Sequence, residues 1–441
     1  MADIKDSVIQ AKNAAIALSA ANTRAKNKAL TAMADALNAS RKKIIEANEK
    51  DMEAAERMKA KGELTDAMIK RLKVNDEKID GMIEGINDVK KLKDPVGETM
   101  SALELDEDLT LYQIRCPIGL IGVIFESRPD VIPQIMSLCL KSGNAVVLKG
   151  GKEALNTNRA LFDVLSEAAY ASGITKDVFC LMESRSEVSA ILKMNEQIDL
   201  LIPRGSNEFV RYIQSNTKIP VLGHSAGICH VYVDEKADEE TALTVTLDSK
   251  IQYAAVCNAA ETLLVHSRIA RTFLPKMVDL FARNGVEIRA DADIRRILGK
   301  NESVKAAKPS DWDTEYNDLV ISVKLVNTID EAIEFINKHG SKHTDTIITG
   351  DMKNAQRFVS LVDSSSVMIN ASTRFSDGFR YGKGAEVGIS TNKIHSRGPV
   401  GMEGLMIYKY VLIGNGHVVH SYTGKAGKKF KHTVSEKEFK L

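Results

Sequence analysis

The chain has few cysteines, and none of them is spaced to form a metal-binding pair. Five of its 441 residues are cysteines, scattered along the sequence with no CxxC pair. An odd number of isolated cysteines argues against a disulfide framework and against a structural zinc site, and it is typical of a reducing compartment. We therefore expect a cytoplasmic protein. The five are Cys116, Cys139, Cys180, Cys229 and Cys257.

The sequence also lacks a charge excess and a long apolar run. Lys and Arg number 60 and Asp and Glu number 59, a net charge of +1, so no strong field attracts nucleic acid or an anionic membrane. No stretch approaches the ~20 apolar residues that span a bilayer. The alanine-rich N-terminus is interrupted by Lys12 and Asn13, unlike a signal peptide. These absences predict a soluble protein with no nucleic-acid and no membrane partner.

Proline is absent before Pro95, as a long helical start requires. Residues 29–60 combine apolar residues at helical spacing with strong helix formers. We therefore predict that residues 1–90 are helical. At roughly 150 residues per domain, the length predicts two or three domains.

Beyond residue 105 the pattern becomes one of strands. DLTLYQIRCPIGLIGVIFE (108–126) predicts a hairpin or strand pair. Short apolar runs then alternate with helical segments over about 129–203 and again over about 230–370, which predicts parallel sheets covered by helices. MIYKYVLIGNGHVVHSYT (406–423) predicts two strands around a GNG turn, and the polar tail predicts a loose extension.

Two strand-to-helix junctions carry residues suited to a nucleotide. VVLKGGKEA (146–154) places Lys149 at the end of a buried strand, where ligands of parallel sheets bind, and its glycines permit a close backbone approach. LLIPRGSNEF (200–209) places Gly205 and Ser206 before a helix N-terminus, a favourable place for an anion. Ordinary βα turns are the alternative at both junctions, and the Walker A spacing is absent.

Basic residues beside glycines form a second set of candidates. Arg128 follows a strand in FESRPDVIPQ (125–134), and His224 lies in the loop GHSAG. The glycine-rich stretch 379–405 carries three more, which are able to hold a phosphate or carboxylate unless the loop is simply solvated. They are Lys393, His395 and Arg397. The separation of His224 from His230 is not a zinc pattern, so we predict no metal.

Cys257 lies in IQYAAVCNAAETLLV (251–265), beside Asn258 and just before an apolar run. Catalytic thiols act as thiolates and need a polar, partly exposed setting. The other cysteines lie in apolar runs typical of a core. On local context alone, a packed core thiol remains slightly favoured for Cys257.

Taken together, these segments resemble the gamma-glutamyl phosphate reductases, a family of the aldehyde dehydrogenase superfamily. The resemblance covers roughly residues 1–420, and it rests on PIGLIGVIFESRPDV, VVLKGGKEA, LIPRGS, VLGHSAGICHVYVD, AAVCNAAETLLVH and RGPVGMEGLMIYKY. It implies an α/β, aldehyde dehydrogenase-like fold with two parallel-sheet α/β domains plus a β oligomerisation flap. The implied partners are a small-molecule substrate and further copies of the chain, in a dimer or tetramer.

The same resemblance divides the chain into parts. It implies a cofactor-binding domain with N-terminal helices over 1–104 and 119–230, and a catalytic domain over 231–370. The flap takes 105–118 and 405–422, a glycine-rich region takes 371–404, and a polar tail takes 423–441.

Site residues follow by matching motifs. Cys257 matches the superfamily nucleophile, Lys149 matches the lysine that contacts the adenosine ribose or its 2′-phosphate, and Gly205 with Ser206 matches the pair beneath the cofactor's diphosphate and nicotinamide. Lys149 and Lys152 are basic where many NAD-preferring relatives carry a glutamate, which implies NADPH/NADP. Candidates to hold the substrate or its phosphate are Arg128, Arg204, His224, Lys393, His395 and Arg397.

Two departures from the superfamily bear on the reaction. Hydrolytic members carry a glutamate base in an E-L-G-G-K motif, whereas the matching residues 223–227 are Gly-His-Ser-Ala-Gly. The missing base suits an enzyme that releases an aldehyde from a thioester. Ser127 stands where an oxyanion-binding asparagine is usual.

The resemblance therefore implies NADPH-dependent reduction of L-glutamyl 5-phosphate to L-glutamate 5-semialdehyde and phosphate, in proline biosynthesis. The alternatives are a hydrolytic aldehyde dehydrogenase, a small-molecule kinase and an RNA-binding protein.

Overall fold

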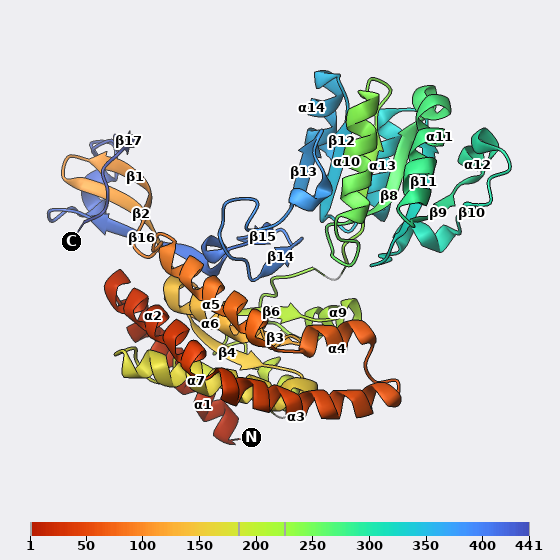
Figure 1. Cartoon of the computed structure of the whole chain (residues 1–441). Helices are drawn as coiled ribbons and strands as arrows, with labels where there is room; N and C mark the ends of the chain where they lie inside the picture. Colours follow the sequence, from red (N-terminus) through yellow and green to blue (C-terminus); the bar gives the residue numbers. More distant parts are fainter. Residues whose placement is uncertain (1, 184–185, 225, 441) are drawn as a thin grey trace. The chain divides into compact units, whose positions relative to one another are not determined.

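The chain folds into two compact units, which Figure 1 shows in a computed structural model describing residues 2–183, 186–224 and 226–440. The first unit comprises 1–222 and 401–441, and the second comprises 223–400. The chain therefore enters the second unit eight residues before the boundary predicted at 230/231. Most of the glycine-rich stretch also belongs to the second unit. Within the described ranges, no helix is long and apolar enough to cross a membrane.

The predicted helical start is a series of separate helices. They are α1 (Ala2–Ser19), α2 (Thr23–Ala39), α3 (Arg41–Ala60), α4 (Asp66–Leu72) and α5 (Asp76–Lys91). Polar caps explain several of the breaks. The side chains of Asn22, Thr65 and Asn75 accept hydrogen bonds from the backbone N–H three residues on, which begins a new helix.

A parallel sheet of order β5-β4-β3-β6 forms the centre of the first unit. Its strands are β3 (Leu120–Phe125), β4 (Ala145–Lys149), β5 (Phe179–Met182) and β6 (Leu200–Arg204), and the connecting helices are α6 (Val131–Ser142), α7 (Leu155–Ala171) and α8 (Ser186–Ile191), with α9 (Asn207–Ser215) after β6. The chain builds outward from β3 to β5 and then returns to place β6 on the other side of β3. This reversal creates a switch point beyond the carboxyl ends of β3 and β6, where ligands of open α/β sheets bind.

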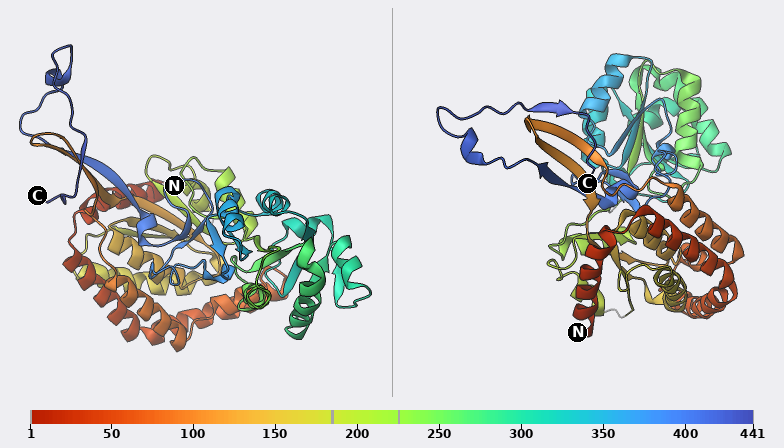
Figure 2. Two further views of the ribbon diagram at one scale, coloured as in Figure 1. Left: turned by 90° about the horizontal axis from the view of Figure 1, so that it is seen from above. Right: turned by 90° about the vertical axis from the view of Figure 1, so that its left-hand side faces the viewer.

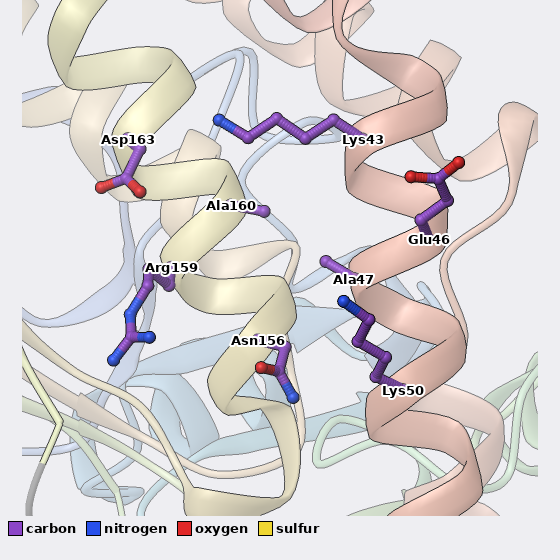
Figure 3. A pocket seen from close by; sticks show the side chains of 8 residues that line it. All are labelled: Lys43, Glu46, Ala47, Lys50, Asn156, Arg159, Ala160 and Asp163. Carbon is purple, nitrogen blue, oxygen red and sulfur yellow. The ribbon is translucent and has the colours of Figure 1, made fainter.

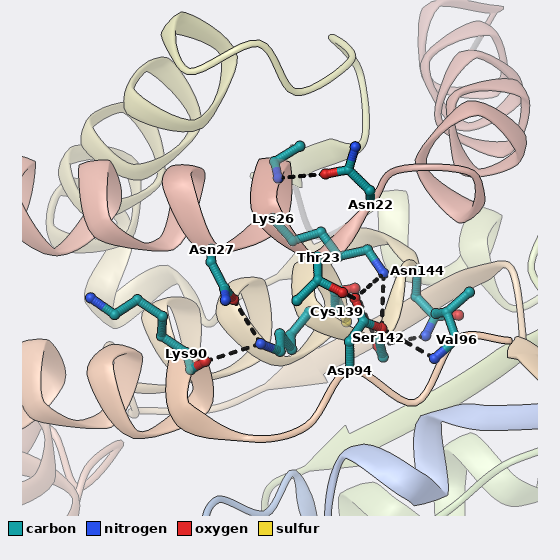
Figure 4. Close-up of polar contacts among 12 residues, drawn as sticks. Asn22, Thr23, Lys26, Asn27, Lys90, Asp94, Val96, Cys139, Ser142 and Asn144 are labelled. Carbon is teal, nitrogen blue, oxygen red and sulfur yellow. Dashed lines mark hydrogen bonds and ion pairs between the residues drawn. The ribbon is translucent and has the colours of Figure 1, made fainter. Parts of the chain in front are cut away.

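Buried lysines fix the helices of this unit to one another (Figure 4). The Lys26 side chain is fully buried and its Nζ lies 3.0 Å from a carboxylate oxygen of Asp94. Lys141 Nζ donates to Asn27 Oδ1 at 2.7 Å and to the carbonyl of Lys90 at 3.0 Å. Because an unpaired buried ammonium is costly, these bonds specify how α2, α5 and α6 meet.

The first unit also contains an antiparallel sheet of order β16-β2-β1-β17. Its strands are β1 (Thr99–Asp106), β2 (Leu109–Pro117), β16 (Met406–Ile413) and β17 (Thr433–Ser435). The prediction of two strands over 406–423 is wrong in its second half, because β16 pairs with β2 and Val419–Tyr422 form a 3-10 turn, η5.

The C-terminal tail is not loose. It runs out beyond the strands and returns (Figure 2), and β17 pairs with β1. Local contacts hold it: the rings of Tyr422 and Phe430 stack at 4.5 Å, and the Tyr422 hydroxyl donates to Asp106. Phe439 packs edge-on against Tyr112. These aromatic contacts explain why a mostly polar segment is ordered.

A second parallel sheet, of order β10-β9-β11-β8-β7-β12-β13, forms the centre of the second unit. The strands are β7 (Cys229–Val233), β8 (Ala260–His266), β9 (Glu287–Ala290), β10 (Val304–Ala306), β11 (Val320–Val326), β12 (Thr344–Ile348) and β13 (Ser366–Ile369). The helices are α10 (Glu239–Ile251), α11 (Ser267–Arg283), α12 (Ala292–Leu298), α13 (Ile329–His339) and α14 (Met352–Leu361). A short antiparallel pair, β14 (Gly388–Ser390) and β15 (Gly398–Val400), follows. The sequence patterns miss β10, β11 and α12; in β11, Ser322 and Lys324 interrupt the apolar run.

Alternate residues of the central strands build two separate cores. Val231 and Val233 pack with α10, α11 and α12, whereas Tyr232 packs with α13 and α14. Successive strand residues face opposite sides of a sheet, so helices cover both faces, as the continuous apolar runs predict.

Candidate active site

The candidate site lies where three neighbouring strands of the second unit begin. Cys229 opens β7, Cys257 lies in the turn before β8, and His343 immediately precedes β12. Because β8, β7 and β12 are adjacent and parallel, their amino ends lie together at one edge of the sheet. His224 joins them from the loop before β7. The site therefore lies at the amino edge, opposite to the usual ligand edge of a parallel sheet.

A thiol and two imidazoles meet at this edge. One ligand-type atom each from His224, Cys257 and His343 lies within 4.8 Å of the other two. The His224 and His343 rings are 5.0 Å apart between centroids, edge to face. Cys257 is half-buried and His343 is fully buried. The sequence analysis put forward Cys257 and His224 and did not put forward His343.

Hydrogen bonds orient both rings. His224 Nδ1 lies 2.9 Å from the carbonyl of Ile389 on β14. His343 Nδ1 lies 2.8 Å from Thr344 Oγ1 and 3.7 Å from Cys229 Sγ. In the part of the chain that is described, His343 Nε2 is buried and has no hydrogen-bond partner. In the tautomer that carries the ring proton on Nδ1, this nitrogen offers a lone pair to a proton or another partner.

Gly227 brings the histidine loop against the cysteine. A Cβ at position 227 would lie 2.1 Å from the carbonyl oxygen of Cys257 and 2.5 Å from its Cα. No side chain fits there, so glycine is required by the approach of two backbones. Ser225, in the middle of the same loop, lies outside the described residues.

The other cysteines differ from Cys257 in their surroundings. Burial raises the pKa of the Cys229 thiol and of the Cys139 thiol well above the usual value, and burial also raises the pKa of half-buried Cys116. Cys229 donates to the carbonyl of Cys257 at 3.2 Å, so it supports the turn. Low thiolate character makes these thiols poor nucleophiles.

Arg374 is a further cation of this site that sequence reasoning missed. It lies on a short 3-10 turn, η3 (Thr373–Phe375), near enough to Cys257 for the two charges to interact. Its Nε donates to Gln252 at 2.9 Å, and burial lowers its pKa. The run NASTRFSDG gives no periodic or glycine-loop signal that would have singled it out.

A buried carboxylate lies four residues after Cys257, but it is already engaged. Lys250 Nζ lies 2.6 Å from Glu261 Oε2, and both side chains are almost fully buried. Burial raises the pKa of Glu261 to about 7. The ion pair occupies this carboxylate, and residues 223–227 contain neither Asp nor Glu.

The predicted basic loop is partly neutralised. Lys393 Nζ lies 2.8 Å from a carboxylate oxygen of Asp363, and Arg397 lies 3.1 Å from the other oxygen of the same group. The bond from Lys393 lowers the pKa of Asp363. His395 is exposed on the same loop. The structure brings Lys393 and Arg397 together on Asp363.

In the first unit, the predicted nucleotide junction after β6 lies at the switch point, and the other follows β4. Gly205 and Ser206 connect β6 to α9, and the Ser206 side chain caps α9 by accepting from the N–H of Phe209. Glu126, just after β3, accepts from the Ser206 N–H at 3.1 Å, and burial raises its pKa. A Cβ at 205 would lie 2.4 Å from the Glu126 carboxylate, so a larger residue there would displace the Glu126 side chain.

The lysines near β4 differ in exposure. Lys149 ends β4, is buried, and donates to the carbonyl of Gly150. Lys152 is exposed and lies 3.3 Å from Glu63. The glycines between them serve this chain's own packing, since a Cβ at 150 or 151 would strike Asn158 or Glu153 respectively.

Ser127 is hydrogen-bonded within the first unit. Its N–H and its Oγ both donate to Glu153 Oε1, at 2.6 and 2.9 Å. Its φ is +48°, an uncommon conformation for a residue with a side chain. Arg128 follows it, half-buried, and Arg204 ends β6.

A groove between α3 and α7 contains none of the predicted site residues (Figure 3). Its volume is about 240 Å³ and its walls include Lys43 and Lys50. Asp163 and Glu46 offset them, and Arg159 is paired with Glu183. The groove therefore presents no net cationic surface for a phosphate.

The comparisons with known proteins agree with this arrangement. Residues 1–295 match the family described as Aldehyde dehydrogenase family. The chain is 60% identical over 440 residues to a gamma-glutamyl phosphate reductase of Methanosarcina barkeri, covering 99% of this chain and 98% of that protein. It is 52% identical over 438 residues to a gamma-glutamyl phosphate reductase of Acetivibrio thermocellus, covering 99% and 100%. The crystal structure of gamma-glutamyl phosphate reductase from Thermotoga maritima is similar with a TM-score of 0.90 at 41% identity, covering 94% of this chain and 99% of that one.

Proposed function

The chain belongs to the aldehyde dehydrogenase family, in the branch of the gamma-glutamyl phosphate reductases, and we propose that it reduces L-glutamyl 5-phosphate to L-glutamate 5-semialdehyde with NADPH, releasing phosphate, as a step of proline biosynthesis. One observation carries the proposal. The half-buried thiol of Cys257 lies beside two imidazoles and within electrostatic reach of one arginine, next to a loop without a carboxylate.

The imidazoles supply what the thiol needs. A thiolate is the nucleophile, and a neighbouring imidazole that accepts the thiol proton produces it. His343 is suited to this because its buried Nε2 lacks a partner within the described residues. Arg374 stabilises the negative charge that remains on Cys257.

The Cys257 thiolate attacks the acyl carbon, a C–S bond forms, and the bond to phosphate breaks. Phosphate is a good leaving group, so this step needs no strong acid. When bound, NADPH would supply a hydride to the carbonyl carbon of the thioester. The resulting thiohemiacetal on Cys257 then breaks its C–S bond, which releases the aldehyde and restores the thiolate.

The first unit has features that fit a dinucleotide. The turn at Gly205 and Ser206 lies at the switch point and opens onto the N-terminal amides of α9, where a diphosphate is favoured. Lys149 ends β4, which is separated from β6 by β3, and Lys152 follows it. They would contact the adenosine ribose and its 2′-phosphate.

Changing Lys152 to glutamate should shift the cofactor preference toward NADH. A carboxylate near a 2′-phosphate repels it, whereas a surface ammonium contributes little more than about 1 kcal/mol. We expect kcat/KM for NADPH to fall about tenfold relative to that for NADH. Steady-state kinetics with both cofactors measures this ratio. Lys176→Glu, also exposed in the first unit, should leave the ratio unchanged.

Changing Arg374 to glutamine should weaken binding of the acyl phosphate or of phosphate in the reverse reaction. Charge-assisted hydrogen bonds contribute about 1.5–3 kcal/mol, so we expect a loss of roughly 10- to 100-fold in kcat/KM. Arg271→Gln, on the exposed face of α11, is the control. An unchanged phosphate dependence would remove Arg374 from the site.

The reverse reaction tests the proposal as a whole. Enzyme, glutamate semialdehyde and NADP are mixed at increasing phosphate, and the formation of NADPH is followed. We expect NADPH only when phosphate is present, because phosphate must release the thioester. NADPH formed equally well without phosphate would mean that water attacks the thioester, and a hydrolytic dehydrogenase would replace the present proposal.

We also infer that β16 mediates association between copies of the chain. Tyr408, Tyr410 and Leu412 alternate along this strand and are exposed, so one apolar face of it is uncovered. Sedimentation measurements on Tyr410→Glu should show a smaller assembly than the parent chain forms.

A further inference from the structure

We propose that His224, Cys257 and His343 form a binding site for a soft divalent cation, of which Zn²⁺ is the best match. The ligand-type atoms of the three side chains lie within 4.8 Å of one another. In tetrahedral zinc sites with Zn–S near 2.3 Å and Zn–N near 2.0–2.1 Å, ligand atoms are roughly 3.3–3.6 Å apart. Side-chain movements of about 1 Å bring the three atoms to that spacing.

The chemistry of the donors selects the metal. One thiolate and two imidazoles are ligands of zinc and related metals, whereas Mg²⁺ and Ca²⁺ prefer oxygen. Three protein ligands leave a fourth position for water, as in open zinc sites. His230 takes no part, because its ring is buried against Asp345.

The surroundings of the imidazoles match those of metal ligands. Such histidines usually donate the second ring N–H to a carbonyl or another oxygen, which fixes the ring. Here the Nδ1 atoms of His224 and His343 lie at the carbonyl of Ile389 and at Thr344 Oγ1. The Nε2 of His343 is the independent indication, since it is fully buried and unpartnered within the described ranges. A buried polar nitrogen without a partner is unfavourable, and a metal ion would satisfy it.

Occupancy of this site would inhibit the enzyme. A thiolate that donates its electron pair to Zn²⁺ no longer attacks an acyl carbon, and bound His343 no longer accepts a proton. This consequence rests on the proposed function, whereas metal binding itself does not. Zinc would therefore act as a reversible inhibitor that a chelator removes.

The test uses Co²⁺ and Zn²⁺ with the full-length chain, stripped of metal by a chelator and kept reduced. We expect one Co²⁺ per chain, with a thiolate-to-cobalt absorption band in the near ultraviolet that Zn²⁺ abolishes by displacement. Cys257→Ser should lose the band, and His343→Gln should bind Co²⁺ more than about 100-fold more weakly. Circular dichroism and thermal unfolding verify that both variants fold.

Matched controls separate this site from other thiols and histidines. Cys116→Ser and Cys180→Ser remove half-buried cysteines elsewhere, and His339→Gln removes a histidine paired with Asp313. All three should retain the band. No band in the parent chain, or an unchanged band in folded Cys257→Ser, would overturn the proposal. Zinc binding without loss of activity would keep the metal site and overturn Cys257 as the nucleophile.

Discussion

Replacing Cys257 with serine should reduce turnover by at least about 10³-fold, because an alcohol is a far weaker nucleophile than a thiolate at neutral pH. Serine is nearly the same size, so the turn before β8 and its contact with Gly227 should persist. Cofactor affinity should be unchanged, since the cofactor candidates lie in the first unit. The measurement is kcat in the phosphate-dependent reverse reaction, together with a titration of NADP binding.

The chain provides its own controls for this substitution. Cys116 and Cys180 are half-buried, as Cys257 is, and both lie in the first unit. Cys116→Ser and Cys180→Ser should therefore keep near-parental kcat. Near-full activity in Cys257→Ser would show that another group attacks the substrate.

Replacing Gly227 with alanine should cost at least about 100-fold in kcat, because small displacements of a reacting group have effects of that size. The added methyl would meet the Cα, carbonyl carbon and carbonyl oxygen of Cys257 at 2.1–2.6 Å. Backbone atoms have no alternative rotamer, so the turn that carries the thiol must move. The rate of Cys257 alkylation by iodoacetamide, measured with kcat, reports this movement.

Gly81→Ala is the matched control for the glycine substitution. Gly81 lies within α5, and a Cβ there would meet nothing within 4 Å. Alanine at a helix interior is more favourable than glycine by about 1 kcal/mol, so this variant should be fully active and slightly more stable. Full activity in Gly227→Ala would mean that the two loops separate without moving the thiol.

The sequence predicts the parallel sheets well because their apolar runs are continuous and buried on both faces. Tyr232 and its neighbours Val231 and Val233 serve opposite cores, so all three must be apolar. The sequence does not predict β11, because Ser322 and Lys324 interrupt its run of apolar residues. The sequence does not predict that the C-terminal tail is ordered, because this order depends on the ring contact between Tyr422 and Phe430, which no local pattern reveals.

The candidate site was only partly accessible from sequence, for a topological reason. His224 and Cys257 have local signals, a glycine loop and a thiol before a strand. His343 lies 86 positions after Cys257 along the chain and comes beside it only because β12 pairs with β7. The order of the strands in the sheet brings His343 beside Cys257, and this order cannot be derived from hydrophobic periodicity. Arg374 was missed for the same reason, because contacts between elements place it. Hydrogen bonds through Ser249 and Ser372 fix its turn to α10.

The short strand β17 determines in how many directions the antiparallel sheet can grow. It covers the edge of β1, so within the described residues β16 is the outer strand at the opposite end. The edge that β17 presents is only three residues long, whereas β16 presents eight. A second copy therefore has one long edge to pair with, which favours closed pairs. A chain cut after Thr423 would expose β1, eight residues long, in place of β17, so both edges would be long and each added copy would present a new one. The residues after Thr423 therefore limit edge-to-edge association of the sheet. Without them, copies of the chain could add one after another at both edges.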